Sequence, residues 1–204
     1  MAVFSFFGNR AKLEAAILKV FSDPPVIETD RLLLRKIVPA YAADMYRYAS
    51  DPEVTKYLTW SPHSSERETA RYIDLLQRKY ADGSFNDFGV TLKDSGRMIG
   101  TCGFTSFDFP HNTAELGYVL ARDMWGKGIA PEAVRAVMQF GYETFGLDGY
   151  TAKFMEGNTA SERVMIKCGM TLEGRYRHSL YVKGSFRNII VYQIRRDGVL
   201  SSET

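Results

Sequence analysis

The sequence predicts a single α/β domain with a mixed sheet and helices on both of its faces. Its 204 residues are enough for one compact core and too few for two. Short strand-like runs alternate with segments of helical periodicity along the chain. In the second half, a glycine-rich turn after a strand leads into a helix and then another strand, which is the order of a crossover unit.

The composition excludes several classes of protein. Hydrophobic residues make up 45% and charged residues 25%, as in an ordinary globular chain. No stretch reaches the run of about 18 apolar residues that a membrane-spanning helix needs. The net charge of +2 comes from 26 basic and 24 acidic residues, so it predicts no nucleic-acid partner. An anionic ligand must therefore be held locally.

The cysteines and histidines predict neither a disulfide framework nor a metal site. Cys102 and Cys168 form no CxxC pair, and His63, His111 and His178 lie far apart in the sequence. Two separate thiols suit a reducing compartment. The N-terminus lacks the long apolar region and cleavage site of a secretory signal, so we expect a cytoplasmic protein.

An N-terminal helix is predicted before the main domain. Its apolar residues share one face, which we expect to dock on the domain, although a second subunit or a membrane surface would also fit. A Pro-Pro pair ends it. The expected divisions are a helical extension over 1–25, the main domain over 26–197 and a tail over 198–204; the apolar face comprises Leu13, Ile17, Val20 and Phe21.

The main domain is predicted to contain a strand, two helices, a three-stranded meander, a helix, a strand, a helix and a final hairpin. Turn residues and changes of periodicity set these boundaries. The expected ranges are 31–35, 39–50, 64–80, 85–92, 98–107, 114–121, 129–145, 150–155, 159–167, 170–181 and 187–194.

The glycine loop Gly126-Lys127-Gly128 before the helix at Ile129 is the central functional signal. A helix N-terminus presents free N–H groups and a partial positive charge, which favour an anion. A Walker A motif would need glycine where Ala121 stands, and a dinucleotide fingerprint would need a small residue where Pro131 stands. The loop alone leaves an anion site and an ordinary strand-to-helix turn as alternatives.

The surrounding sequence resolves these alternatives by resemblance. The run TAELGYVLARDMWGKGIAPEA, followed by EGNTASERVMIKCGMTLEG, closely resembles the GNAT superfamily of N-acetyltransferases, and within it the ribosomal-protein serine/alanine N-acetyltransferase-like branch. The segment IETDRLLLR is similar to the opening of that branch. The resemblance covers about residues 26–195. It implies a splayed sheet of six to seven strands and acetyl-CoA as co-substrate.

The resemblance also implies which residues hold the cofactor. The pantetheine arm would pair with the backbone of Val119 and Leu120 like an extra strand. Trp125 replaces the Gln or Arg found in much of the superfamily, as is common in this branch. The pyrophosphate would lie on the amides of Gly126, Lys127, Gly128, Ile129 and Ala130.

Three further residues carry the implied chemistry. Asn158 would hold the pantetheine, and Ser161 would protonate the departing thiol, because Met165 stands where many relatives place a tyrosine. N-capping or packing is the alternative role of Ser161. Glu115 would act as general base through one water; alternatively it is a structural carboxylate satisfied by the backbone or by Arg122.

The expected reaction is direct transfer of the acetyl group to a primary amine, without an acyl-cysteine. An α-amine, with a pKa of about 7.7 to 8.0, is neutralised more easily than a lysine near 10.4. This and the branch favour a protein N-terminus over a polyamine, amino sugar or free amino acid. Candidate acceptor contacts, which packing would equally explain, are Tyr57, Trp60, Tyr176, His178 and Tyr181.

Two non-enzymatic functions remain as alternatives. One is an acyl-CoA-binding regulator without turnover, and the other is an interaction protein that uses the N-terminal helix and the C-terminal hairpin. An unpaired strand in that hairpin would favour a homodimer.

Overall fold

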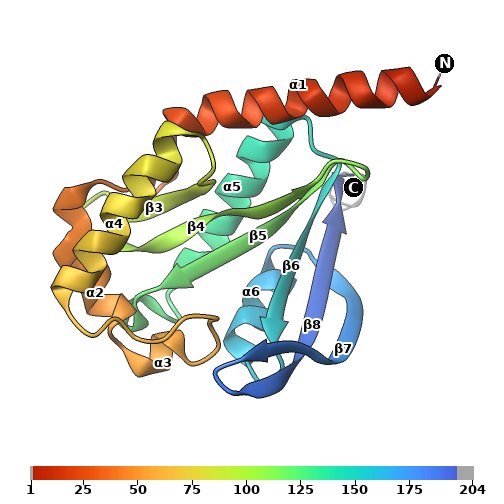
Figure 1. The fold of residues 1–204 in the computed structure, drawn as a ribbon. Coiled ribbons are helices and arrows are strands. Elements are labelled where there is room, and N and C mark those ends of the chain that lie inside the picture. Colours follow the sequence, from red (N-terminus) through yellow and green to blue (C-terminus); the bar gives the residue numbers. More distant parts are fainter. Residues whose placement is uncertain (1, 197–204) are drawn as a thin grey trace.

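The computed structural model describes residues 2–196, with side chains from Arg10 onward. The described part contains one eight-stranded sheet in the order β1-β2-β3-β4-β5-β6-β8-β7, with helices packed on it (Figure 1). The strands are β1 (Ile27–Glu28), β2 (Leu32–Arg35), β3 (Asp87–Leu92), β4 (Met98–Asp108), β5 (Thr113–Leu120), β6 (Gly149–Met155), β7 (Thr171–Val182) and β8 (Ser185–Arg195). The α-helices are α1 (Ala2–Ser22), α2 (Ala42–Ala49), α3 (Pro52–Thr55), α4 (Glu66–Ala81), α5 (Ile129–Phe145) and α6 (Thr159–Lys167).

The predicted mixed α/β sheet is confirmed, and its strand count is higher than the expected six to seven. The additional strand is β1, whose two residues pair with Leu33 and Leu34 of β2. A strand of two residues has no periodicity to detect in a sequence. The turn that follows β1 is closed by Thr29, whose hydroxyl accepts a hydrogen bond from the N–H of Leu32 at 3.0 Å.

The last turn of α4 fixes the start of β3. Ser65 caps the N-terminus of this helix by accepting a hydrogen bond from the N–H of Glu68 at 3.2 Å. At the other end, the hydroxyl of buried Tyr80 accepts from the N–H of Ile37 at 3.2 Å and donates to the carbonyl of Asp87 at 2.9 Å. The first residue of β3 is therefore tied directly to the helix.

The sheet divides at β5. This strand pairs with β4 along its full length, but its parallel pairing with β6 covers only Thr113–Leu116. From Gly117 onward the two strands diverge, as Figure 1 shows where β5 and β6 separate below their paired ends. The β5-α5-β6 crossover thus leaves the second half of β5 with a free edge.

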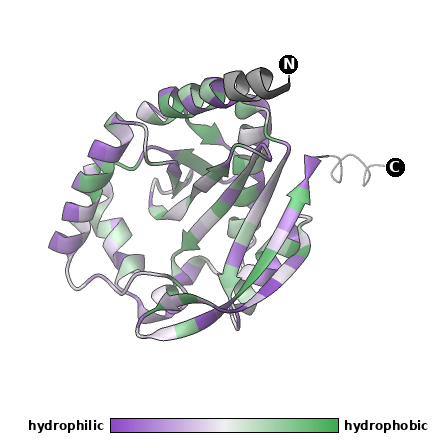
Figure 2. Ribbon diagram, turned by 45° about the vertical axis from the view of Figure 1, so that its right-hand side comes forward, coloured by the Kyte–Doolittle hydropathy of each residue, from purple (hydrophilic) through white to green (hydrophobic). Residues whose placement is uncertain are grey.

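The N-terminal helix α1 docks on the domain, as predicted. Ile17 and Phe21 are buried, and the Phe21 ring lies 5.5 Å from that of Phe88 and 6.1 Å from that of Phe145. Aromatic rings at such separations add to the stability gained by burial. Figure 2 shows hydrophobic residues along the central strands and hydrophilic ones on the outer turns of the helices. The extension shares its core with the rest of the protein.

Candidate active site

The glycine loop has the geometry of an anion-binding helix N-terminus. Gly126 and Gly128 have φ angles of 74° and 75°, in the left-handed region that favours glycine. Gly128 is the N-cap of α5, and no side chain caps this end of the helix. The first N–H groups of α5 are therefore available to a ligand.

An ion pair braces this loop from the β1–β2 turn. The Arg31 guanidinium donates from Nε to the Glu132 carboxylate at 2.7 Å and from Nη1 to the Lys127 carbonyl at 2.9 Å. Glu132 also accepts from the Thr29 hydroxyl at 2.6 Å. Burial raises the pKa of Glu132, but hydrogen bonds from Thr29 and Arg31 outweigh it, so the net pKa lies below its usual value. The carboxylate is ionised and holds the loop.

A pocket of about 640 Å³ opens between the free edge of β5 and the N-termini of α5 and α6. Most of the predicted cofactor residues line it. The side chain of Lys127 is exposed, and Lys127 and Glu115 are outside the lining. The predicted residues that line the pocket are Val119, Leu120, Trp125, Gly126, Gly128, Ile129, Ala130, Asn158 and Ser161.

Trp125 connects the loop to the free edge of β5. Its Nε1 donates to the Leu120 carbonyl at 2.9 Å, while its side chain remains partly exposed at the pocket. Because the N–H of Ala121 donates to Ile99 on β4, the backbone of Leu120 faces the opposite edge. Trp125 thus occupies one of the two polar groups that Leu120 offers to a ligand.

Asn158 and Ser161 lie together at the start of α6. Asn158 caps this helix, and its Oδ1 accepts from the N–H of Ser161 at 3.2 Å. The Ser161 hydroxyl lies 2.8 Å from that of Tyr118, which also donates to the Ser161 carbonyl at 3.1 Å. Tyr118 was not predicted from the sequence, because a strand residue facing a helix 43 positions later carries no local signal.

Tyr118 places a phenol hydroxyl beside that of Ser161 in the pocket. Burial raises its pKa, although the hydrogen bond with Ser161 acts in the other direction. The phenol therefore stays protonated at neutral pH. The pair can accept, donate or relay a proton at the point where β5 leaves β6.

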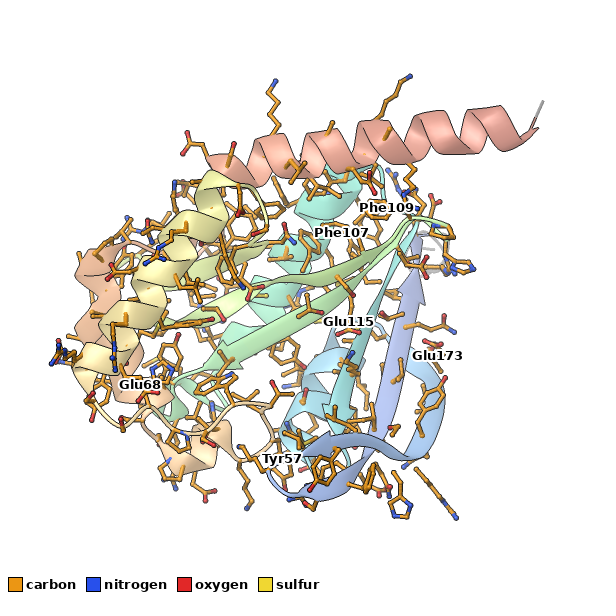
Figure 3. The ribbon with its side chains drawn as sticks, viewed as in Figure 1. Tyr57, Glu68, Phe107, Phe109, Glu115 and Glu173 are labelled. Carbon is orange, nitrogen blue, oxygen red and sulfur yellow. The ribbon has the colours of Figure 1, made fainter. Side chains whose placement is uncertain are left out.

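Glu115 is a satisfied carboxylate on β5 (Figure 3). It pairs with Lys153 of β6 at 2.8 Å and accepts from the Thr105 hydroxyl at 2.7 Å. The structural alternative considered from the sequence named Arg122 as partner, whereas the cation present is Lys153. A general base here must exchange this cation for an amine or a water.

The aromatic residues expected to contact the acceptor lie in different parts of the structure. Tyr57 lines the pocket, and Trp60 packs against the core with its ring 5.5 Å from that of His63. Tyr176 and Tyr181 are exposed on β7, an edge strand of the sheet. Only Tyr57 among these residues belongs to the pocket lining.

Both cysteines are buried and unpaired. Burial raises the pKa of Cys168 to about 11 and that of Cys102 well above its usual value, so both are thiols rather than nucleophilic thiolates. Residues 2–196 contain no cluster of three or more potential metal ligands. In the same range, every helix is too short or too polar to cross a bilayer.

The pocket suits an acyl thioester linked to a pyrophosphate, the donor of a CoA-dependent acyltransferase. An uncapped helix N-terminus meets the anion, and a free strand edge receives an amide-bearing arm. Residues 31–171 match the family model described as an acetyltransferase (GNAT) domain, and the chain belongs to this family. It is an acetyl-CoA-dependent N-acetyltransferase, as the sequence predicted.

Two sequence relatives differ in what their names specify. An uncharacterized N-acetyltransferase, p20 of Bacillus licheniformis, is 33% identical over 166 residues, which cover 81% of this chain and 93% of p20. The spermidine N(1)-acetyltransferase of Escherichia coli strain K12 is 23% identical over 146 residues, covering 72% of this chain and 76% of that protein.

Solved structures have the same fold. A GNAT-family acetyltransferase from Bacillus anthracis superposes with a TM-score of 0.75 at 26% identity, covering 85% of this chain and 99% of that one. RimL, a ribosomal L7/L12 alpha-N-protein acetyltransferase in complex with coenzyme A, has a TM-score of 0.72 at 20% identity, covering 85% and 99%.

Proposed function

We propose that this enzyme transfers the acetyl group of acetyl-CoA directly to the α-amine at a protein N-terminus. The observation that carries the proposal is the meeting of the free β5 edge with the Tyr118–Ser161 hydroxyl pair in one pocket. The pair supplies the proton that a leaving thiolate needs, and both cysteines are unsuited to a covalent intermediate.

The residues divide the work between binding and proton transfer. The α5 N-terminus binds the pyrophosphate, and the free edge of β5 positions the thioester. With the Leu120 carbonyl held by Trp125, the Leu120 N–H is the group left to hold the pantetheine or the developing oxyanion. Ser161 gives its proton to the departing sulfur, and Tyr118 replaces it.

The preference for an α-amine follows from acidity and from related folds. At neutral pH an α-amine loses its proton far more readily than a lysine, by about three pKa units. RimL, which shares the fold, is an alpha-N-protein acetyltransferase of ribosomal L7/L12. We propose the same class of acceptor for the present chain. We also propose that the enzyme is cytoplasmic.

A small-molecule amine is the second candidate acceptor. The similarity to a spermidine acetyltransferase supports it. A polyamine still carries positive charge on its other nitrogens when one nitrogen reacts. An enzyme for such an acceptor is therefore expected to have acidic residues at the acceptor site, which a neutral peptide chain does not need.

We also propose that the enzyme forms a homodimer through the C-terminal hairpin. Strand β7 is one of the two edge strands of the sheet, and Tyr176, Tyr181 and Phe186 are exposed on the hairpin. A free edge strand with apolar side chains is a common site of self-association. Solution mass measured at rising concentration tests this, and a monomer throughout would contradict it.

Acetyl-CoA consumption tests the proposed function. The panel contains peptides with free Ser, Ala or Thr N-termini, their N-acetylated forms, spermidine, amino sugars and amino acids. Turnover confined to free-amine peptides is expected, with Gly128→Glu inactive through loss of CoA binding. Turnover only with small amines would reject the N-terminal acceptor, and CoA binding without turnover would indicate a regulator.

Initial-rate measurements test whether the acetyl group is transferred directly or through an acyl-enzyme. Direct transfer needs both substrates bound together, so intersecting patterns are expected. Parallel patterns would indicate an acyl-enzyme and contradict the assignment of both cysteines as structural thiols.

A further inference from the structure

Asp87, the first residue of β3, is a carboxylate that the steps above leave unused. The ring of the next residue, Phe88, packs against Phe21 of α1 and Phe140 of α5. Successive side chains of a strand point to opposite faces, so Asp87 lies on the face that α2 and α4 cover. This is also the face of Glu115.

The Asp87 carboxylate has a buried oxygen without a partner. A Cβ on Gly103 of β4 would come within 2.5 Å of Oδ1, so this oxygen lies directly over the neighbouring strand. Oδ1 is sealed from solvent and forms no hydrogen bond with the described residues, and the same holds for Oδ1 of Asn86. Burial raises the pKa of Asp87 to about 7. A buried polar atom of this kind costs stability unless a ligand satisfies it.

The groups that face Asp87 from the helices are tyrosines, and Arg35 of β2, which pairs with Gly89, lies on the same face of the sheet without forming an ion pair with Asp87. Tyr48 of α2 and Tyr72 and Tyr80 of α4 face it. Burial raises the pKa of Tyr72, and the charge of Asp87 raises it further. The pKa of Tyr48 is raised by burial, then by Tyr72 and then by Asp87. The Tyr80 hydroxyl is already used by backbone groups. Asp87 forms no ion pair within the described part of the chain. The carboxylate is therefore surrounded by protonated phenols and has no paired positive charge.

The strand register directs this carboxylate at the reaction centre. Asp87 pairs with Gly103, and Gly103 pairs with Gly117, the first β5 residue beyond the pairing with β6. Adjacent strands are about 4.8 Å apart, so Oδ1 over Gly103 is about one strand spacing from the fork. Thr105, which is exposed, covers Gly117 with its methyl group. This side of the fork is therefore open to solvent beside Asp87.

The comparison with Glu115 shows which carboxylate is free. Glu115 already has the Lys153 ammonium at 2.8 Å and the Thr105 hydroxyl at 2.7 Å. Asp87 has neither. Of these two acidic groups on one face, Asp87 is the one that lacks a cation.

We infer that Asp87 is the acceptor-binding carboxylate, which pairs with the primary ammonium group of the acceptor in front of the thioester and takes a proton from it. The inference rests on the proposed function, because it uses the same fork as the acceptor site. One proton of the ammonium passes to Asp87, and the neutral nitrogen forms its bond to the acetyl carbon as the C–S bond breaks. A second proton leaves the nitrogen as the amide forms, and the thiolate receives one through Ser161. The net products are the amide, the CoA thiol and one proton.

Binding measurements in the presence of CoA test this without turnover. The probes are a heptapeptide with a free N-terminal serine, its N-acetylated form, spermidine and its acetylated form. At pH 8 the wild type should bind a free amine at least tenfold more tightly than its acetylated form. Asp87→Asn should lose this preference while its Kd for CoA changes less than twofold. Asp94→Asn, which removes a carboxylate in the exposed turn between β3 and β4, is the control and should keep the preference.

The outcomes separate this inference from the proposed function. A free-amine preference that survives in Asp87→Asn, or that is absent from the wild type, overturns the role of Asp87. If the peptide is acetylated and Asp87→Asn still prefers the free amine, the role fails and the function stands. If Asp87→Asn loses the preference but the wild type acetylates nothing, the ammonium site stands and the function fails. Unchanged affinity for CoA in Asp87→Asn shows that a loss does not come from misfolding.

Discussion

The guanidinium of Arg31 contacts the carboxylate of Glu132, with Nε and Oε2 2.7 Å apart. This pair joins two segments about 100 positions apart and lies beside the glycine loop where α5 begins. The turn before β2 therefore sets the position of the loop that we propose as the cofactor-binding loop.

Arg31→Ala should raise the KM for acetyl-CoA about tenfold, which corresponds to about 1.4 kcal/mol of binding free energy, with kcat little changed. The reason is that the Lys127 carbonyl and Glu132 lose their shared donor. Arg10→Ala is the control, since Arg10 pairs with Glu14 within α1. An unaltered KM in Arg31→Ala would show that the loop holds its shape unaided.

Gly126→Ala should weaken CoA binding because the loop needs a left-handed residue at this position. No heavy atom lies within 4 Å of the added Cβ, so the cost comes from the backbone, about 1–2 kcal/mol. Gly184→Ala in the β7–β8 turn has a φ of 77° and equally open surroundings, and it should cost similar stability. Calorimetric titration with CoA distinguishes the two variants, because only Gly126→Ala should lose affinity for CoA. An equal loss of affinity in both variants would refute a specific role for the loop.

Ser161→Ala and Tyr118→Phe should each lower kcat about 100-fold, at the lower end of the contribution of a general acid. Because the two hydroxyls act in series, the double variant should be little worse than either single one. Tyr192→Phe provides the control. The Tyr192 hydroxyl donates to Glu162, which lies next to Ser161 on α6, and both Tyr192 and Glu162 are outside the pocket lining. Additive losses in kcat would indicate separate roles.

Asp87→Asn should change how stability depends on pH. The pKa of Asp87 is raised in the folded state, so between about pH 4 and 7 the folded protein holds a proton that the unfolded chain releases. Stability therefore falls as pH rises through this window, by up to about 4 kcal/mol for a shift of three units. Urea unfolding at pH 5 and pH 8 should show this fall in the wild type and a smaller one in Asp87→Asn.

Asp94→Asn, in an exposed hairpin turn, is the control for this experiment. It should follow the wild type at both pH values. Identical pH dependence in Asp87→Asn and the wild type would mean that Asp87 is paired in solution, contrary to the structure.

Phe21→Ala should destabilise the whole domain by about 3–5 kcal/mol, because it leaves a cavity among Phe88, Phe104 and Phe145. Leu18→Ala, on the exposed side of α1, should cost well under 1 kcal/mol. Chemical unfolding followed by tyrosine absorbance measures both. A small effect of Phe21→Ala would show that α1 is an independent appendage.

Local signals explain how much of the fold the sequence could predict. Helix α5 has its predicted bounds because Gly128 and Gly146, both with left-handed φ angles, mark its two ends. The meander and the final hairpin follow their turn residues in the same way. The short α3 was missed, although Asp51 caps it and Pro52 starts it, because four residues carry no periodicity.

The site was predictable only where neighbours in sequence remain neighbours in space. Gly126, Gly128 and Asn158 reach the pocket from contiguous motifs. The contacts of Tyr118 with Ser161 and of Lys153 with Glu115 depend on strand register and on the divergence of β5 and β6. Cross-strand register cannot be read from one strand alone, so these partners required the structure.

The position of Trp125 makes its fluorescence sensitive to what the pocket holds. It is one of two tryptophans in the chain; it lies half-exposed at the pocket, while Trp60 packs against His63 elsewhere. A CoA molecule seated on the loop would change the polarity and solvent access around its indole. In a Trp60→Phe background, the emission spectrum would then report cofactor occupancy from a single built-in fluorophore, without any label.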